Sequence, residues 1–256
     1  MRFDHFIPCD HLKPYISFFA IQEAEEENTY RVLPDTNMVV GFQFKGRLTL
    51  IDETHQTVLS TAGITGLTDY YKTFRNSKNI GTVLVYFKEA TVGLFFRHPL
   101  HELFRESISL ENFLLRSELL VIEDRLYEAK TDRERITVVE NFLLAQLKFT
   151  QPDKLVAAAL ALIHKANGNI RIAALAKALN TSQSPLEKRF RQAVGTTPKK
   201  FATIVRMKHV LRQVPLTQAI PDVGYAVGFY DQAHFIKEFK SFTGETPVSF
   251  FQKKKT

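Results

Sequence analysis

Cys9 is the only cysteine among the 256 residues of this sequence. A single thiol cannot form an internal disulfide, which excludes a disulfide-stapled secreted domain and is typical of a reducing compartment. Long apolar runs are missing too, since none approaches the roughly 20 residues that a membrane-spanning helix needs. The first ten residues include Asp4, His5 and Asp10, unlike a secretory signal peptide. We expect a soluble, cytoplasmic protein without a membrane partner.

Motifs of the common enzyme classes are also missing. The sequence has no glycine-rich phosphate loop and no Gly-x-Ser-x-Gly nucleophile turn. Its one compact group of metal-ligand side chains is His98, His101 and Glu102. This group follows Pro99 at an expected helix start and lacks paired histidines on neighbouring strands. We therefore predict no catalytic residues, no metal and no cofactor, and we interpret the chain as a non-enzyme.

Acidic side chains are scarce in the C-terminal part. From Asp153 to Thr256 there are 17 Lys and Arg against 6 Asp and Glu, a formal net charge of +11. Residues 1–152 carry 17 basic and 21 acidic side chains, a net of −4. A locally basic helical region is the electrostatic footprint of a protein that binds duplex nucleic acid. A membrane surface could use the same charge, but frequent turns argue against one long amphipathic helix.

Two C-terminal stretches repeat each other, and each is typical of a helix, a tight turn and a second helix. The apolar stripe of the first helix recurs at an offset of 48, as Ile172, Leu175, Ala176 and Leu179, then Ile220, Val223, Gly224 and Val227. The second helix recurs at an offset of 49, as Leu186, Phe190 and Ala193, then Phe235, Phe239 and Phe242. Each copy closes alike, as Gly195-Thr196-Thr197-Pro198 and Gly244-Glu245-Thr246-Pro247. The glycines suit a left-handed helix end, and Thr followed by Pro suits the start of the next helix.

A helix-turn-helix unit places its second helix in the major groove of DNA, while the first helix braces it against the backbone. Two tandem units could read successive groove segments. Glutamine can pair with adenine and lysine with guanine. Ordinary solvated helix faces are the alternative, which the repeat, its turns and the local charge disfavour. The residues off the apolar stripes are Gln183, Ser184, Glu187, Lys188 and Arg191, then Gln232, Ala233, His234, Lys237 and Lys240.

Residues 160 to 251 resemble the DNA-binding domain of the AraC/XylS family of bacterial transcription regulators. The resemblance is carried by Leu175-Ala176, Ser182 to Arg191, Gly195 to Phe201 with Arg206, and above all Gly228 to Phe235 and Phe239 to Pro247. The departures are Pro221, tolerated early in a helix, and Gly224 where alanine is usual. Some DNA-repair methyltransferases carry a related region, but they need several cysteines, and Cys9 stands alone.

The resemblance implies base contacts from Ser184, Glu187 and Lys188 in the first unit and from Gln232, Ala233, His234 and Lys237 in the second, to which the repeat adds Gln183. We expect DNA-backbone contacts from Thr181, Ser182, Arg191, Lys199, Lys200, Arg206 and Lys240. Arg206 could instead brace the linker between the units. That linker, Pro198 to Gln213, contains no helix breaker and is expected to hold the two recognition helices roughly 34 Å apart, one turn of B-DNA.

The N-terminal half reads as strands followed by helices, which makes the fold class α+β. The expected strands are 15–21, 30–33, 38–44, 48–52, 62–67 and 80–87, forming a small β-barrel or curled sheet. Two helical stripes follow, at Leu115, Leu119, Ile122 and Leu126, then at Ile136, Val139, Leu143 and Leu147, with a capping box from Thr131 to Glu134. Aromatic side chains near the strands could line a ligand cavity or form plain core: Phe18, Phe19, Tyr30, Phe42, Phe44, Tyr70, Tyr71 and Phe87.

We therefore interpret the chain as two domains. Residues 1–150 form a sensory or dimerisation domain, with strands to about 90 and helices over about 99–150, and residues 154–256 bind DNA through units at about 170–194 and 218–243. The resemblance implies a cupin-like N-terminal barrel with a small-molecule effector, homodimers, promoter DNA as partner, contact with RNA polymerase, and transcriptional activation. A ligand-independent architectural or constitutive DNA binder is the alternative, with the N-terminal half only an assembly module. A cupin-type metalloenzyme with an appended DNA-binding domain is a third, weaker hypothesis, which metal analysis tests.

Overall fold

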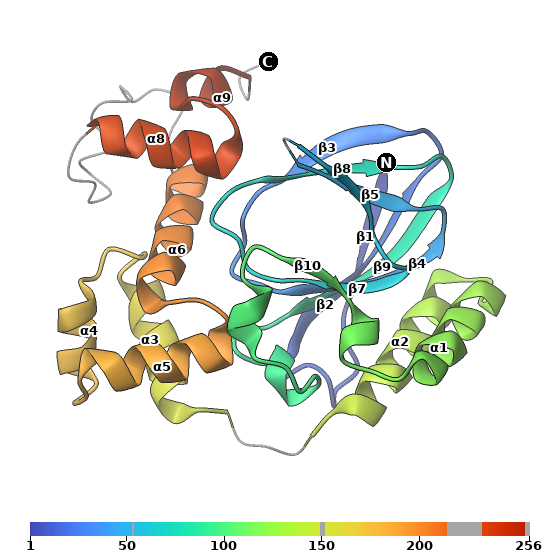
Figure 1. Cartoon of the computed structure of the whole chain (residues 1–256), viewed down its shortest axis with the longest axis horizontal. Helices are drawn as coiled ribbons and strands as arrows, with labels where there is room; N and C mark the ends of the chain where they lie inside the picture. The colour runs from blue at the N-terminus through green and yellow to red at the C-terminus, as the bar shows by residue number, and fades with distance from the viewer. Residues whose placement is uncertain (53, 149–151, 214–231, 254–256) are drawn as a thin grey trace.

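Strands, helices and a C-terminal region whose described elements are all helices follow one another along the chain, as predicted (Figure 1). The computed structural model describes residues 1–52, 54–148, 152–213 and 232–253. Six of its strands lie where the sequence predicts strands, and β1, β6, β8 and β10 were not predicted. The α+β fold class is confirmed.

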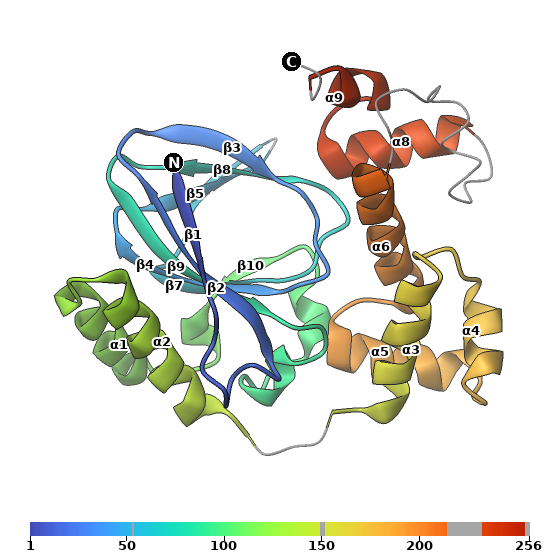
Figure 2. The same ribbon diagram turned by 180° about the vertical axis from the view of Figure 1, so that it is seen from behind.

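The strands form two antiparallel sheets that face each other (Figures 1 and 2). The larger sheet has the order β1-β2-β9-β4-β7-β10, and the smaller has the order β3-β8-β5-β6. Both sheets end in edge strands, so the structure is curled and open rather than a closed barrel. The strands are β1 (Arg2–Phe6), β2 (Ile16–Ala24), β3 (Asn28–Val32), β4 (Val39–Lys45), β5 (Leu48–Ile51), β6 (Gln56–Val58), β7 (Ala62–Thr65), β8 (Lys72–Asn76), β9 (Ile80–Phe87) and β10 (Ser107–Ser109).

Side chains alternate between the two faces of the larger sheet, because successive residues of a strand point to opposite sides. Helices α1 (Arg116–Glu128) and α2 (Asp132–Gln146) cover one face of this sheet. The side chains buried on that face include Val40 and Phe42 of β4 and Val83 and Val85 of β9. The ring of Phe42 meets that of Phe142 edge-on, with centroids 5.6 Å apart. The other face turns toward the smaller sheet.

The predicted stripes of α1 and α2 are mostly buried. Their buried members are Leu119, Ile122, Leu126, Ile136, Val139 and Leu143. Leu115 is 70% exposed, contrary to the prediction, because it is the N-cap residue before α1. The capping box of α2 is confirmed: Thr131 Oγ1 accepts from the Glu134 N–H at 3.2 Å, and Glu134 Oε2 accepts from the Thr131 N–H at 3.1 Å.

Two short 3-10 helices, η1 (Val92–Leu94) and η2 (Leu100–Leu103), lie between β9 and β10, and a third, η3 (Leu110–Asn112), lies between β10 and α1. Helix α1 also exposes Leu120, Val121 and Tyr127. Dimerisation through these helices stays a prediction.

The C-terminal region contains α3 (Lys154–Lys165), α4 (Ile172–Ala178), α5 (Gln183–Val194), α6 (Pro198–Gln213), α8 (Gln232–Thr243) and α9 (Pro247–Lys253). Helix α6 has the bounds predicted for the linker and runs from the first unit to the second (Figure 1). The predicted first helix of the second unit, with Pro221 and Gly224, lies outside the described residues. None of the helices in the described ranges is long and apolar enough to cross a membrane.

Among the residues that the structure describes, the buried side chains form two separate clusters. The larger joins the sheets, α1, α2 and the first helix-turn-helix unit, and it extends to Phe201 and Val205 on α6. The smaller contains Ile204, Met207 and Val210 of α6, with Phe235, Phe239, Phe242 and Phe251 of the second unit. Helix α6 therefore belongs to both cores.

Candidate nucleic-acid interface and cavity

Helix α5 presents a polar face to solvent. Its N-cap residue is Ser182, and Leu186, Phe190 and Val194 are buried against the rest of the first unit. Because those residues recur at helical spacing, the intervening side chains point outward. The predicted base-contacting residues Gln183, Ser184, Glu187 and Lys188 are all exposed.

Helix α8 repeats this arrangement in the second unit. Phe235, Phe239 and Phe242 are buried. The predicted base-contacting residues Gln232, Ala233, His234 and Lys237 are all exposed. His234 Nε2 lies 3.3 Å from Glu238 Oε1 one turn along the helix. Both helices thus offer equivalent exposed glutamine and lysine side chains.

Both recognition helices end in the same turn. Gly195 and Gly244 are left-handed, with φ of 86° and 81°, as predicted. Helices α6 and α9 then begin at the two predicted prolines. The second helix of each unit and the turn after it therefore repeat in structure as well as in sequence.

A bidentate ion pair braces α5 against α3. Arg189 Nε and Nη2 each lie 2.7 Å from a carboxylate oxygen of Asp153. Asp153 Oδ1 also accepts from the N–H groups of Leu155 and Val156, so it caps α3. Burial acts to raise the pKa of Asp153, but hydrogen bonds from Arg189 and the two backbone N–H groups outweigh it, so this pKa is lowered.

The predicted backbone-contacting residues fall into two groups. Ser182, Arg191, Lys199 and Lys240 are exposed, and Thr181 is half-buried. Lys200 instead turns to the N-terminal domain, with Nζ 4.2 Å from the centroid of the Phe104 ring and 3.9 Å from Asp69 Oδ2. Arg206 Nη2 lies 3.5 Å from Glu238 Oε2 of α8, and burial lowers the pKa of Arg206. The bracing role considered for Arg206 matches this contact.

The N-terminal domain touches the equivalent turn at the end of each recognition helix. A Cβ atom on Gly195 would clash with the Met38 side chain and lie 2.8 Å from the Leu100 carbonyl oxygen. A Cβ atom on Gly244 would lie 2.9 Å from Cε1 of Tyr71. The N-terminal domain therefore packs against both units at matching places, and it lies beside both in the ribbon view (Figure 2).

Polar contacts extend this docking. The Tyr71 N–H donates to the Ser241 carbonyl of α8 at 3.3 Å. Arg31 Nη1 lies 3.5 Å from Glu245 Oε1 in the turn after α8. Lys208 of α6 forms an ion pair with Asp35, and His164 of α3 lies 2.9 Å from Glu89 Oε1. These docking contacts give no signal in the sequence, because each contact joins segments that lie far apart along the chain.

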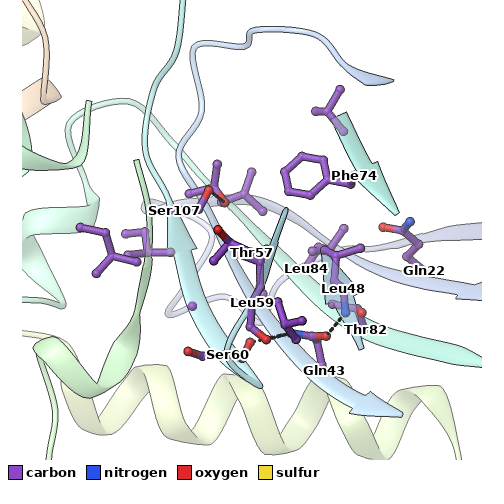
Figure 3. Close-up of a pocket in the computed structure, with 18 of the residues that line it drawn as sticks. Gln22, Gln43, Leu48, Thr57, Leu59, Ser60, Phe74, Thr82, Leu84 and Ser107 are labelled. Carbon is purple, nitrogen blue, oxygen red and sulfur yellow. Dashed lines mark hydrogen bonds between the residues drawn. The ribbon is translucent and has the colours of Figure 1, made fainter. Parts of the chain in front are cut away.

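A cavity of about 390 Å³ lies between the two sheets, a volume in the usual range of small-molecule sites. Phe74 of β8 and Leu84 of β9 are among the side chains that line it (Figure 3). Met1, Phe3, Val32 and Val58 line it and are also exposed to solvent, so they mark its opening. None of the described side chains that line the cavity is charged.

Two glutamines fix polar groups around the cavity. Gln43 Oε1 accepts from the Leu48 N–H at 2.6 Å, and its Nε2 donates to the Ser60 carbonyl at 2.5 Å, which ties the two sheets together (Figure 3). Gln22 Nε2 donates to the Tyr30 hydroxyl at 2.8 Å. Burial raises the pKa of Tyr30, and the hydrogen bond from Gln22 opposes that rise. Burial also raises the pKa of Tyr86 to about 12, so both phenols are neutral donors.

The aromatic residues near the strands divide between several roles. Phe19, Phe42 and Phe87 are core, and Tyr30 lines the cavity. The others serve elsewhere: Phe18 stacks on Tyr86, Phe44 lies beneath Arg135, and Tyr70 and Tyr71 lie beside Arg105 and Arg31. Both predicted roles, cavity and core, thus occur.

The group considered as a metal site makes ordinary contacts. His98 Nε2 lies 3.3 Å from Glu102 Oε2, and its ring meets Phe113 edge-on. Within the described residues, no three His, Cys, Asp or Glu side chains come together as metal ligands would.

Comparison with known proteins finds a separate match in each half of the chain. Residues 175–253 match a helix-turn-helix domain, and residues 4–109 match a domain of unknown function, DUF6597. The Msm operon regulatory protein of Streptococcus mutans is 36% identical over 93 residues, 35% of this chain and 33% of that protein. The HTH-type transcriptional regulator GlxA of Rhizobium meliloti is 35% identical over 79 residues, 30% of this chain and 24% of that protein. The match thus spans a third or less of either relative.

Among solved structures, unsaturated fatty acid bound ToxT from Vibrio cholerae is 14% identical, with 91% of this chain and 94% of that chain covered and a TM-score of 0.45. The AraC-like transcriptional activator CuxR is 14% identical, with 80% and 79% covered and a TM-score of 0.31. These likenesses are too weak to carry an argument about this chain.

Proposed function

We propose, from the AraC-type helix-turn-helix domain in the C-terminal region of this chain, that the protein is a transcriptional regulator that binds specific DNA. Helices α5 and α8 enter successive major-groove segments, and α6 sets their separation. The observation that carries the proposal is the pair of equivalent exposed faces: Gln183 with Lys188 on α5, and Gln232 with Lys237 on α8. The surrounding net charge of +11 from Asp153 to Thr256 supplies attraction to phosphate.

The two lysines read base edges. A lysine in the major groove donates to guanine O6 and N7, and such contacts discriminate by about 1–3 kcal/mol per base pair. Lys188→Ala and Lys237→Ala should therefore each relax the preference at one base step, in different halves of the site. His234 and Glu238 already contact each other, so His234 can present its ring to DNA in a fixed orientation.

The test is a selection of bound duplexes from a random pool, with the full-length protein at two salt concentrations. Two enriched sequence elements about one helical turn apart are expected. Each lysine variant should weaken the base preference in one of these elements and leave the other unchanged. Lys45→Ala removes the same charge from an exposed site on β4 and should leave the motif unchanged. Salt-sensitive binding without any enriched motif would overturn specific readout and favour the architectural alternative.

The N-terminal domain acts as the sensor in this proposal. It supplies a cavity of ligand size, and it contacts both recognition-helix turns. A ligand that binds one docked arrangement better than another shifts the population of arrangements. An effector in the cavity therefore changes how the two units are held relative to each other, and so changes promoter binding.

Weakening the contact between the N-terminal domain and the second unit tests this coupling. Arg31→Ala removes the ion pair between the N-terminal domain and Glu245 while leaving the DNA-facing surfaces untouched. If the N-terminal domain controls the second unit, Arg31→Ala should change affinity for two-element sites and leave affinity for a single first element unchanged. Arg47→Ala, an exposed arginine near the same sheet, is the matched control. Identical DNA binding by wild type and Arg31→Ala would contradict the coupling.

A further inference from the structure

Lys72 is a buried lysine beside the cavity. It is the first residue of β8, and with Phe74 and Asn76 it points to the inner side of the smaller sheet, where it is only 5% exposed. Its Nζ donates to the Ser107 hydroxyl at 3.1 Å. No described carboxylate forms an ion pair with it. The exposed Glu106 attracts this ammonium without forming an ion pair with it, and a buried ammonium that lacks a paired carboxylate is costly, so its presence calls for a reason.

Ser107 passes the effect of this charge to the cavity wall. An ammonium group can only donate, so the Ser107 oxygen accepts from Lys72 and its own proton points onward. Ser107 Oγ lies 3.2 Å from Thr65 Oγ1, and both residues line the cavity. This corner therefore offers hydroxyl donors with a cation behind them, whereas the exposed residues at the opening, such as Phe3 and Val58, are apolar.

We propose that the cavity binds an apolar small molecule with one anionic head group, a carboxylate or a comparable monoanion, and that this group is held at Ser107 and Thr65 against the charge of Lys72. The inference rests on the proposed function, in which this cavity is the effector site. Charge complementarity excludes cationic ligands. The uncharged, largely apolar walls around the corner disfavour sugars and other ligands that need many hydrogen bonds.

The group formed by Lys72, Ser107 and Thr65 is also connected to the residues that contact the second helix-turn-helix unit. Lys72 directly follows Tyr71, whose N–H holds the Ser241 carbonyl of α8. On the neighbouring strand Val32 pairs with Lys72, and it directly follows Arg31, the partner of Glu245. A head group that draws Lys72 toward the cavity therefore acts on the two residues that hold the second unit.

Two fluorescent probes that differ mainly in charge test the proposal on the full-length protein. 8-Anilinonaphthalene-1-sulfonate carries a monoanion, and N-phenyl-1-naphthylamine is its neutral counterpart. Lys72→Met should weaken binding of the sulfonate about tenfold, the effect of one hydrogen bond to a charged group, and leave the neutral probe within about twofold. Lys72→Arg keeps the charge and should restore most of the sulfonate affinity. Equal effects on both probes, or none on the sulfonate, would overturn the assignment.

A second variant separates this inference from the proposed function. Leu84→Trp fills the cavity from β9 and should abolish binding of both probes. If wild type binds both probes at the site that Leu84→Trp blocks, but Lys72→Met changes neither, the cavity is a ligand site for another class of molecule. If wild type binds neither probe, the cavity is no small-molecule site, and the sensor role fails together with the inference. Lys78→Met, an exposed lysine just after β8, controls for loss of charge alone.

Discussion

Replacing Lys72 by methionine should make the protein more stable at neutral pH. Burial lowers the pKa of Lys72 from 10.5 to about 8, so keeping the side chain charged in the folded protein costs about 3 kcal/mol at about 1.4 kcal/mol per pKa unit. The nearby exposed Glu106 offsets part of this effect, and the lowered value already includes it. Methionine fills a similar space without a charge, but its introduction also removes the hydrogen bond to Ser107, worth about 1 kcal/mol. A net gain of about 2 kcal/mol is expected.

The gain should disappear as the pH rises. Between pH 8 and pH 10.5 the unfolded lysine is protonated while the native one is largely neutral. The unfolded state then binds more protons, so the stability of wild type rises with pH relative to the variant. Below pH 8 both states hold the proton and the full difference is present. The advantage of Lys72→Met should therefore be constant below pH 8 and small near pH 10.5.

Urea unfolding followed by far-UV circular dichroism measures this difference, since the chain has no tryptophan to report by fluorescence. Wild type, Lys72→Met and Lys78→Met are compared at pH 7 and pH 9.5. Lys78→Met removes an exposed charge and should behave as wild type at both pH values. A Lys72→Met protein that is less stable than wild type at pH 7, or whose advantage does not shrink by pH 9.5, would refute the reasoning.

Three further changes test other parts of the molecule. Gly195→Ala forces a side chain into left-handed backbone and against the Leu100 carbonyl, so it should lower the free energy of unfolding by at least about 1–2 kcal/mol. Thermal unfolding measures that loss. Asp153→Asn should cost about 1 kcal/mol at neutral pH. Because the pKa of Asp153 is lowered, this difference should fade as the pH drops below 3.8, which denaturation at pH 7 and pH 3 would show. Lys199→Ala should weaken binding to cognate and scrambled duplexes alike in a titration, and a loss confined to cognate DNA would contradict a phosphate contact.

The sequence is sufficient to predict several helices of the C-terminal region. The linker helix from Pro198 to Gln213 was predicted with the observed bounds, because helix signals such as apolar periodicity and a terminal proline are local. The left-handed glycines Gly195 and Gly244 followed from the same local rules. The exposed faces of α5 and α8 then follow from which residues are apolar.

The strands that were missed are those with little apolar alternation. Strand β8 reads Lys-Thr-Phe-Arg-Asn, and its inward residues are Lys72, Phe74 and Asn76. Asn76 is fully buried because its amide donates to the carbonyls of Glu26 and Ser77, a pairing that joins distant segments. Whether such a polar residue can be buried in a strand depends on its partners from distant segments, so the local sequence gives no signal for the strand. The contacts between the N-terminal domain and the two units were unpredictable for the same reason, and so was the set of residues that lines the cavity, apart from Tyr30.

The separation of the two buried clusters has a consequence for how DNA is held. The first unit shares its core with the sheets, so it should exchange its amide hydrogens as slowly as the whole protein unfolds. The described part of the second unit buries Phe235, Phe239 and Phe242 in a separate cluster, so this unit can open while the first unit stays closed. Affinity for a two-element operator then scales with the fraction of molecules in which that cluster is closed, whereas affinity for the first element alone does not. Closing a separate aromatic core thereby sets how steeply occupancy depends on the second half of the operator.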